Sequence, residues 1–200
     1  MHMDIAEEKA RIRKEIRRRR KLLSSKILSE IDSSLPEFIA AIDDPELKSK
    51  LKKAKRIALY RAYNGEVPVE GLSRSFMEKG ITCCFPKIVN EEMIFVDCKS
   101  LSDELFATSS MGIKEPVSDA AVDPKDIDVV VLPALAYNEE GIRLGAGGGY
   151  YDRYIGEAGD KRPYLLGICY EFQICSDVPY NDQDIAADFI AVIPSEEYEE

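Results

Sequence analysis

The sequence predicts a three-layer α/β/α fold with a mostly parallel central sheet and additional helices at the N-terminus. Short apolar runs at 128–132, 164–170 and 189–193 are typical of strands buried on both faces. Segments with helix start and stop signals separate them, and alternating strands and helices favour a parallel sheet covered on both sides. We therefore expect residues 1–200 to form one domain, Rossmann-like in its arrangement.

The N-terminal quarter of the chain predicts helices. Asp4 and Glu7 have the spacing of a helix-capping box. Apolar residues then recur seven and four apart, which places them on one helical face: Ile5, Ile12, Ile16, Leu23 and Ile27. Three further helical pieces are expected: one capped by Ser24 or Ser25, one over 36–42 and one over 45–54.

Basic residues are concentrated in this N-terminal part. The net charge is −10, yet 9–26 holds ten Lys or Arg and one acid, so the rest of the chain is strongly acidic. The run 17–21 could indicate nucleic-acid binding, but a solvated helix face is the favoured interpretation beside so acidic a body. Lys9 and Arg13, one turn apart, would project together and could clamp a polyphosphate.

The middle of the chain begins with a predicted strand at 56–63. Pro68 is expected to open a helix that Gly80 ends. Glu66 lies in the loop between them, beyond the carboxyl end of a strand, where open α/β sheets place their ligands. Strands are also predicted at 81–88 and 93–97, with irregular structure at 100–126.

The stretch 132–154 combines glycines with charged and aromatic residues. Gly147, Gly148 and Gly149 are consecutive, and a helix is expected to start at or just after Gly149 and to end at Gly159. Free N–H groups of such a loop and helix start form an anion-binding concavity. The pattern is neither GxxxxGK[ST] nor GxGxxG. The residues alone therefore leave two interpretations: an anion-binding loop flanked by Arg143 and Asp152, or a packing turn.

Composition restricts the other kinds of site. The five cysteines form no CxxC pair, so reduced, mostly buried thiols are expected. His2 is the only histidine, so a metal would be a hard cation on carboxylates, with Mg²⁺ the default. No apolar run approaches the roughly 18 residues that span a bilayer, and we expect a cytoplasmic monomer without membrane or nucleic-acid partners.

The string LPALAYNEEGIRLGAGGGYYDRY resembles the signature of the 5-formyltetrahydrofolate cyclo-ligase family, PGLxFDxxGxRLGxGxGYYD. The matching positions are Gly141, Arg143, Leu144, Gly145, Gly147, Gly149, Tyr150, Tyr151 and Asp152. The resemblance extends along the chain through the segments 85–87, 93–95 and 112–116 and through Gln183, Asp184 and Asp188. Asn138, Gln183 and Ala134 depart from the family pattern, where aspartate, histidine and glycine are usual.

The resemblance implies ATP- and Mg²⁺-dependent cyclisation of 5-formyltetrahydrofolate to 5,10-methenyltetrahydrofolate, with ADP and phosphate released. It implies catalytic roles for Arg143 and Asp152, and Mg²⁺ ligands in Asp152 and Asp184. The implied ATP-binding residues are Lys9, Arg13, Arg143, Leu144, Gly145, Ala146, Gly147, Gly148, Gly149, Tyr150 and Tyr151. The implied substrate-binding residues are Arg61, Glu66, Ala146, Gly147, Gly148, Gly149 and Tyr150.

Three other functions remain open at this point. Asn138 removes a carboxylate beside the glycine loop, so a catalytically inactive nucleotide- or folate-binding protein of the same fold is one alternative. Another is an enzyme that acts on a different phosphorylated small molecule. The third is a nucleic-acid-binding module led by the basic run 17–21, which the acidic remainder of the chain argues against.

Overall fold

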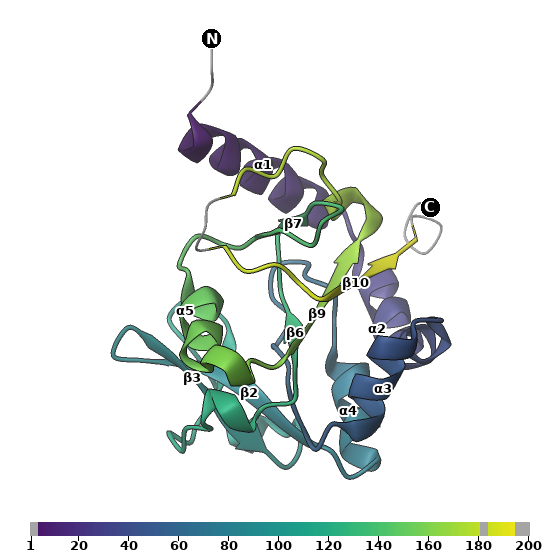
Figure 1. Cartoon of the computed structure of the whole chain (residues 1–200), viewed down its shortest axis with the longest axis vertical. Coiled ribbons are helices and arrows are strands. Elements are labelled where there is room, and N and C mark those ends of the chain that lie inside the picture. Colours follow the sequence, from purple (N-terminus) through teal and green to yellow (C-terminus); the bar gives the residue numbers. More distant parts are fainter. Residues whose placement is uncertain (1–3, 181–183, 195–200) are drawn as a thin grey trace.

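The computed structural model describes residues 4–180 and 184–194. A six-stranded sheet, in the order β10–β9–β6–β1–β2–β3, forms its centre (Figure 1). All neighbouring strands are parallel except β2 and β3, which confirms the mostly parallel sheet. The strands are β1 (Arg56–Ala58), β2 (Thr82–Val89), β3 (Glu92–Cys98), β6 (Val129–Leu132), β9 (Tyr164–Tyr170) and β10 (Phe189–Ile193).

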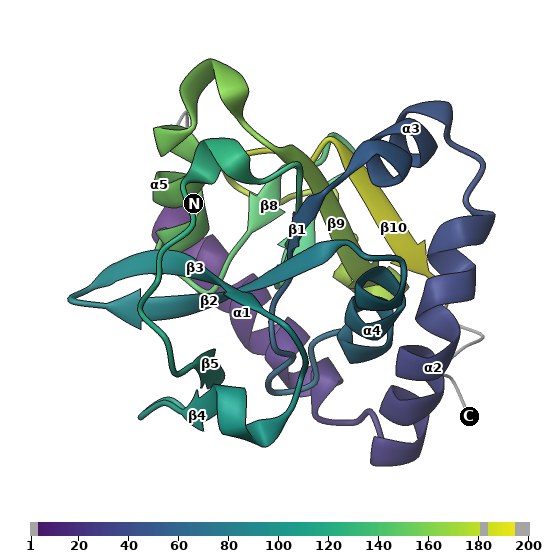
Figure 2. The same ribbon diagram turned by 90° about the horizontal axis from the view of Figure 1, so that it is seen from below.

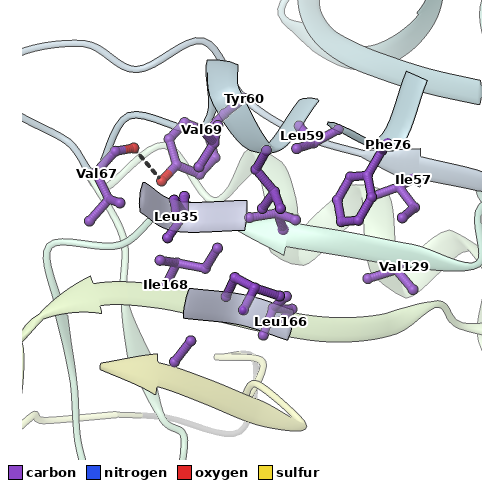
Figure 3. Packing of buried hydrophobic residues seen from close by; sticks show 14 of the residues in the cluster. Leu35, Ile57, Leu59, Tyr60, Val67, Val69, Phe76, Val129, Leu166 and Ile168 are labelled. Carbon is purple, nitrogen blue, oxygen red and sulfur yellow. Dashed lines mark hydrogen bonds between the residues drawn. The ribbon is translucent and has the colours of Figure 1, made fainter. Parts of the chain in front are cut away.

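Helices cover both faces of this sheet, as the apolar strands require. α2 (Ser25–Ala41), α3 (Pro45–Lys53) and α4 (Glu70–Glu78) pack on one face, and α5 (Tyr150–Glu157) packs on the other (Figure 1). Side chains alternate along each strand, so Ile57 enters the cluster under α2–α4 while Ala58 enters the cluster under α5. Figure 3 shows the first cluster between helix and sheet.

The N-terminal helix α1 (Ile5–Arg20) lies outside these three layers. It begins at the predicted cap, where Asp4 accepts a hydrogen bond from the N–H of Ala6 at 3.4 Å. Ile12 and Ile16 pack against the short hairpin of β7 (Ala136–Tyr137) and β8 (Arg143–Leu144), which follows β6. This contact holds α1 across the end of the sheet where β6 terminates (Figure 1).

Residues 100–126 are more ordered than the predicted irregular structure. They contain the antiparallel hairpin of β4 (Phe106–Thr108) and β5 (Lys114–Pro116), which lies beside the β2–β3 ribbon (Figure 2). Short 3₁₀ turns at Asp103–Leu105 and Pro124–Asp126 flank the hairpin. Strands of three residues are too short to show an alternating pattern, which explains why the sequence does not reveal them.

Three predicted boundaries are wrong. β1 ends at Ala58 and not at 63, because the chain turns there into a loop in which the Tyr60 hydroxyl donates to the Val67 carbonyl at 2.8 Å (Figure 3). α4 begins at Glu70, two residues after Pro68. α2 continues through Pro36 instead of dividing there.

The helix tolerates Pro36 because α4 packs where the helical hydrogen bond is lost. Proline has no N–H for the carbonyl of Asp32, four residues earlier. Gly71 of α4 approaches that carbonyl so closely that a Cβ on it would lie 2.1 Å away, and its N–H donates to the Asp32 carboxylate at 2.7 Å.

Within the described residues, no helix is long and apolar enough to cross a bilayer. The single domain over 1–200 stays a prediction.

Candidate functional site

The strand order places a topological switch point between β1 and β6. From β1 the chain continues to β2 on one side, whereas β6 lies on the other side and leads to β9. In open α/β sheets, ligands bind outside the carboxyl ends of the strands at such a point. Two loops leave the sheet here, 59–69 after β1 and 133–149 after β6. They carry most of the residues that the sequence singled out.

The glycine loop 145–149 joins β8 to α5. α5 begins at Tyr150, directly after Gly149, as predicted. Gly147 and Gly149 have φ angles of 114° and 64°, which only glycine adopts without strain. In the described part of the chain, the N–H groups of 146–148 have no hydrogen-bond acceptor, and residues 146–148 are exposed. With the free N–H groups of the first turn of α5, the loop can bind an anion.

Arg143 and Asp152 lie together beneath this loop. One guanidinium nitrogen of Arg143 donates to the Asp152 carboxylate at 2.8 Å, and another donates to the Pro133 carbonyl at 3.1 Å. The guanidinium also lies over the Tyr151 ring, 5.6 Å from its centroid. The Arg143 side chain is only 6% exposed, and its Nε has no acceptor among the described residues. Arg143 therefore connects the β7–β8 hairpin to α5 beneath the glycine loop.

Two side chains of α1 reach the same corner. The Lys9 ammonium lies 2.7 Å from the Asp184 carboxylate, and the Nε of Arg13 donates to the carbonyl of Gly145 at 3.0 Å. Burial lowers the pKa of Arg13, and the charge of Arg17 lowers it further. Arginine nevertheless stays cationic at neutral pH. The structure thus brings Arg13 to the glycine loop, while Lys9 pairs with Asp184.

The predicted metal ligands, Asp152 and Asp184, are also neighbours. Asp152 accepts a hydrogen bond at 3.3 Å from the N–H of Ile185, the residue after Asp184. No group of three or more His, Cys, Asp or Glu gathers for a metal among the described residues. Two carboxylates nevertheless fit Mg²⁺, which takes its remaining ligands from substrate phosphates and water. Gln183 lies outside the described residues.

Glu66 lies in the other loop of the switch point. Its carboxylate accepts from the N–H of Tyr63 at 3.1 Å and lies 3.8 Å from the guanidinium of Arg20, while its side chain is 24% exposed. Burial raises the pKa of Glu66, although Arg20 and the Tyr63 N–H act in the opposite direction. One carboxylate oxygen therefore has a backbone donor, and the other faces a cation without a hydrogen bond.

Arg61 lies in a different environment from Glu66, next to β4 and α4. Its guanidinium lies 4.5 Å from the centroid of Phe106 in β4 and 3.4 Å from the carboxylate of Glu70 in α4. Two of its nitrogens, Nε and Nη1, are buried without a hydrogen-bond partner among the described residues. Arg61 thus has Glu70 as a counter-charge at Nε, and its buried Nη1 has no acceptor among the described residues.

The two tyrosines at the start of α5 have different surroundings. Both tyrosines pack against the core under α5, and Tyr151 also lies edge-on to Phe95, with ring centroids 6.0 Å apart. Tyr150 lies under the loop, where a Cβ on Gly148 would come within 2.6 Å of its ring. The guanidinium of Arg153 lies 5.0 Å from the centroid of Tyr150. Tyr150 is therefore the better candidate for a flat wall of a ligand site.

Asn138 keeps an acceptor role at the turn of the β7–β8 hairpin. Its buried side-chain oxygen accepts from the N–H groups of Glu140 at 3.1 Å and of Ile142 at 2.8 Å. An aspartate carboxylate could accept the same two bonds, so the substitution leaves the turn intact. Asn138 thus shapes the hairpin that carries Arg143.

The sequence interpretation missed two buried polar residues, Arg20 and Gln173. Arg20 is 5% exposed, although the run around it was interpreted as a solvated face. Its position eleven residues after Lys9 and seven after Arg13 puts all three on one helical stripe, a signal that could have revealed it. Gln173, fully buried, donates to the carbonyls of Ala134 and Leu135 at 2.8 and 3.0 Å. No sequence pattern indicates it.

Comparisons with known proteins identify the family of this chain. A family model described as the 5-formyltetrahydrofolate cyclo-ligase family matches residues 5–193. The 5-formyltetrahydrofolate cyclo-ligase of Mycoplasma pneumoniae is 29% identical over 168 residues, 83% of this chain and 87% of the relative. The mouse (Mus musculus) enzyme of the same name is 27% identical over 150 residues, 70% of this chain and 74% of that protein.

Solved structures show the same fold. The 5,10-methenyltetrahydrofolate synthetase of Aquifex aeolicus superposes with a TM-score of 0.73 at 29% identity, covering 92% of this chain and 89% of that one. The 5,10-methenyltetrahydrofolate synthetase of Mycoplasma pneumoniae gives 0.69 at 28% identity, covering 92% and 97%. Because the family match spans nearly the whole chain and includes both loops of the switch point, this chain belongs to the 5-formyltetrahydrofolate cyclo-ligase family.

Proposed function

We propose that the protein catalyses the ATP- and Mg²⁺-dependent cyclisation of 5-formyltetrahydrofolate to 5,10-methenyltetrahydrofolate, with release of ADP and phosphate. The proposal rests on one observation: two loops with different binding groups, 59–69 and 133–149, leave the sheet at the same switch point. The glycine loop, with Lys9 and Arg13 beside it, offers an anion site. Glu66 offers a largely buried acceptor in the neighbouring loop. Relatives and structural neighbours carry the names of this activity.

The reaction needs a good leaving group on the formyl carbon. The formyl oxygen attacks the γ-phosphorus of ATP, the bond from that phosphorus to the β,γ-bridging oxygen breaks, and ADP leaves. The neighbouring nitrogen then attacks the activated carbon, its proton is lost, and inorganic phosphate departs with the former formyl oxygen. Phosphoryl transfer of this kind depends chiefly on positioning and charge neutralisation. It can therefore proceed in a site without histidine.

The chain's own groups would carry out that positioning. The free N–H groups of 146–148 bind phosphate oxygens, and Arg13 and Lys9 offset their charge. Arg143 holds Asp152 in place from beneath the loop. When bound by Asp152 and Asp184, Mg²⁺ supplies further neutralisation of phosphate charge. Lys9, which pairs with Asp184 in this structure, would offset negative charge at the same corner.

The folate would be held by the second loop. The carboxylate of Glu66 accepts hydrogen bonds from N–H groups of the reduced pterin, and Tyr150 supplies a flat surface beside the glycine loop. Arg61 contributes its Nη1 donor to an acceptor of the substrate. The alternative of an inactive binding protein rested on Asn138. The two turn hydrogen bonds of Asn138 give that residue a structural role and weaken this alternative.

We also propose that the enzyme works as a cytoplasmic monomer. The cysteines are free, and four of the five are buried, which supports a reducing environment.

Purified protein incubated with 5-formyltetrahydrofolate, ATP and Mg²⁺ tests the proposal, because the methenyl product has its own absorbance. We expect product with ATP and none without it. Arg13→Met should reduce kcat/KM by about 100-fold by removing a cation from the phosphate loop. Arg11→Met is the matched control, since Arg11 lies on an exposed face of α1 and pairs only with Glu8 among the described residues. Absence of product from the unmodified protein would overturn the proposed function.

A further inference from the structure

Arg20 is buried in a position that a solvated arginine would not occupy. It is 5% exposed, whereas the three arginines before it in the same run are exposed. A guanidinium is costly to remove from water unless it is paired. Because Arg20 is the buried member of this run, we expect it to have a partner that is stabilised by its positive charge.

The surroundings of Arg20 connect α1 to both loops of the switch point. One guanidinium nitrogen donates to the carbonyl of Ala134, in the loop after β6, and another lies 3.8 Å from the carboxylate of Glu66. The backbone of Arg20 also touches Gly65, where a Cβ would lie 2.7 Å from the Arg20 carbonyl oxygen. Gly65 has a φ of 73°, so glycine is required here for two reasons. The contact fixes the loop residue next to Glu66.

Arg20 is also the only cation within ion-pair distance of Glu66 among the described residues. Burial raises the pKa of Glu66, and the charge of Arg20 is the largest influence that lowers it. A carboxylate accepts hydrogen bonds with both oxygens, whereas a protonated carboxyl group has a donor in place of one acceptor. The charged groups and dipoles near the Glu66 carboxyl are Arg20 from α1, Glu70 from α4, Tyr60 and the Tyr63 N–H from its own loop, and Tyr151 from α5. The Tyr170 hydroxyl of β9 donates to the backbone carbonyl of Glu66 at 3.3 Å.

We propose that Arg20 is a positioning residue that holds the Glu66 carboxylate in place and directed at the folate, while the same helix presents Lys9 and Arg13 to the nucleotide. The inference rests on the proposed function for the identity of the ligand. It adds to that function a residue acting through Glu66 and a rigid connection between the two substrate sites. The ion pair has no hydrogen bond at 3.8 Å, which leaves that oxygen of Glu66 available to a ligand.

The test compares Arg20→Met, Arg20→Lys and the control Arg18→Met, which removes an exposed arginine that contacts only Glu15 among the described residues. The first readout needs no activity: the Glu66 carboxyl is titrated by ¹³C NMR and assigned with Glu66→Gln. The second is steady-state kinetics with 5-formyltetrahydrofolate and ATP varied separately between pH 6 and 9.

In Arg20→Met the pKa of Glu66 should move upward, and KM for the folate should rise about 10-fold or more while KM for ATP stays within about twofold. Arg20→Lys keeps the charge and should show a smaller folate-specific rise, and Arg18→Met should match the unmodified protein. If Arg20→Met does not fold, the folate-specific rise in Arg20→Lys carries the test.

An unchanged Glu66 titration in Arg20→Met, or equal rises in both KM values in Arg20→Lys, would overturn the role of Arg20. Failure of the unmodified protein to form product would overturn the proposed function instead, and the titration of Glu66 would still decide the role of Arg20.

Discussion

Gln173 offers a quantitative test of how the loop after β6 is anchored. Its side chain is fully buried and makes three hydrogen bonds: Nε2 donates to the carbonyls of Ala134 and Leu135, and Oε1 accepts from the N–H of Tyr170 at 3.0 Å. It thus joins the end of β9 to the segment that leads into the β7–β8 hairpin. Gln173→Met keeps the length of the side chain and removes all three bonds.

The expected loss follows from the groups left behind. The Ala134 carbonyl keeps Arg20 as a donor, so the Leu135 carbonyl is the group that loses the hydrogen bond from Gln173. A buried group without a partner costs about 1–3 kcal/mol, which gives a loss of about 2 kcal/mol in the free energy of unfolding. For a chain of this size, the melting temperature should fall by about 4–8 °C.

Urea denaturation at neutral pH measures this change, with the slope of the transition expected to stay constant. Gln173→Glu is the informative companion, because it retains the acceptor for Tyr170 but replaces the two donors with a buried charge, so it should be no more stable than the methionine variant. A loss below about 1 kcal/mol in Gln173→Met would refute the reasoning, since it would mean that the Leu135 carbonyl finds another partner.

Two further predictions concern the buried charges of the site. Asp152→Asn should cost about 2–4 kcal/mol of stability, because Arg143 would remain buried without its counter-charge. Arg143→Met added to Asp152→Asn should recover part of that loss in urea denaturation, and a purely additive double variant would contradict direct pairing. Glu66→Gln should gain stability relative to the unmodified protein as the pH rises. Because the pKa of Glu66 in the folded state lies above its ordinary 4.5, the native state holds this proton more tightly than the unfolded chain. The unmodified protein therefore loses stability from about pH 4.5 upward through the folded pKa, and the Gln variant does not. Parallel stability profiles for the two proteins over that range would argue against a raised pKa.

The sheet and most helix starts could be predicted because their signals are local. The runs that became β6, β9 and β10 are apolar on both faces, which is sufficient to identify a buried parallel strand. The caps at Asp4 and Ser24 fixed where α1 and α2 begin. The hairpins β4–β5 and β7–β8 escaped prediction because strands of two or three residues carry no period. Their pairing is decided by the surfaces on which they lie.

The candidate site likewise contains some residues that could be predicted from the sequence and others that could not. The glycine loop was recognisable because consecutive glycines have few uses other than close approach to a ligand or to the backbone. Arg20 was not, because its neighbours in the run are also arginines and its burial is decided by Gly65 and Ala134, far away in the sequence. Gln173 binds backbone carbonyls, which are present at every position. Partners of that kind become visible only in the folded chain.

The position of α1 across the carboxyl ends of the strands has a consequence for how the enzyme is made. Lys9 contacts Asp184 across 175 positions, Arg13 contacts Gly145 across 132, and Arg20 contacts Ala134 across 114. Each of these contacts joins α1 to a residue far along the chain, and contacts so distant in sequence form slowly. The candidate site is therefore incomplete until the chain has been made through Asp184, because a shorter product would lack the partner of Lys9.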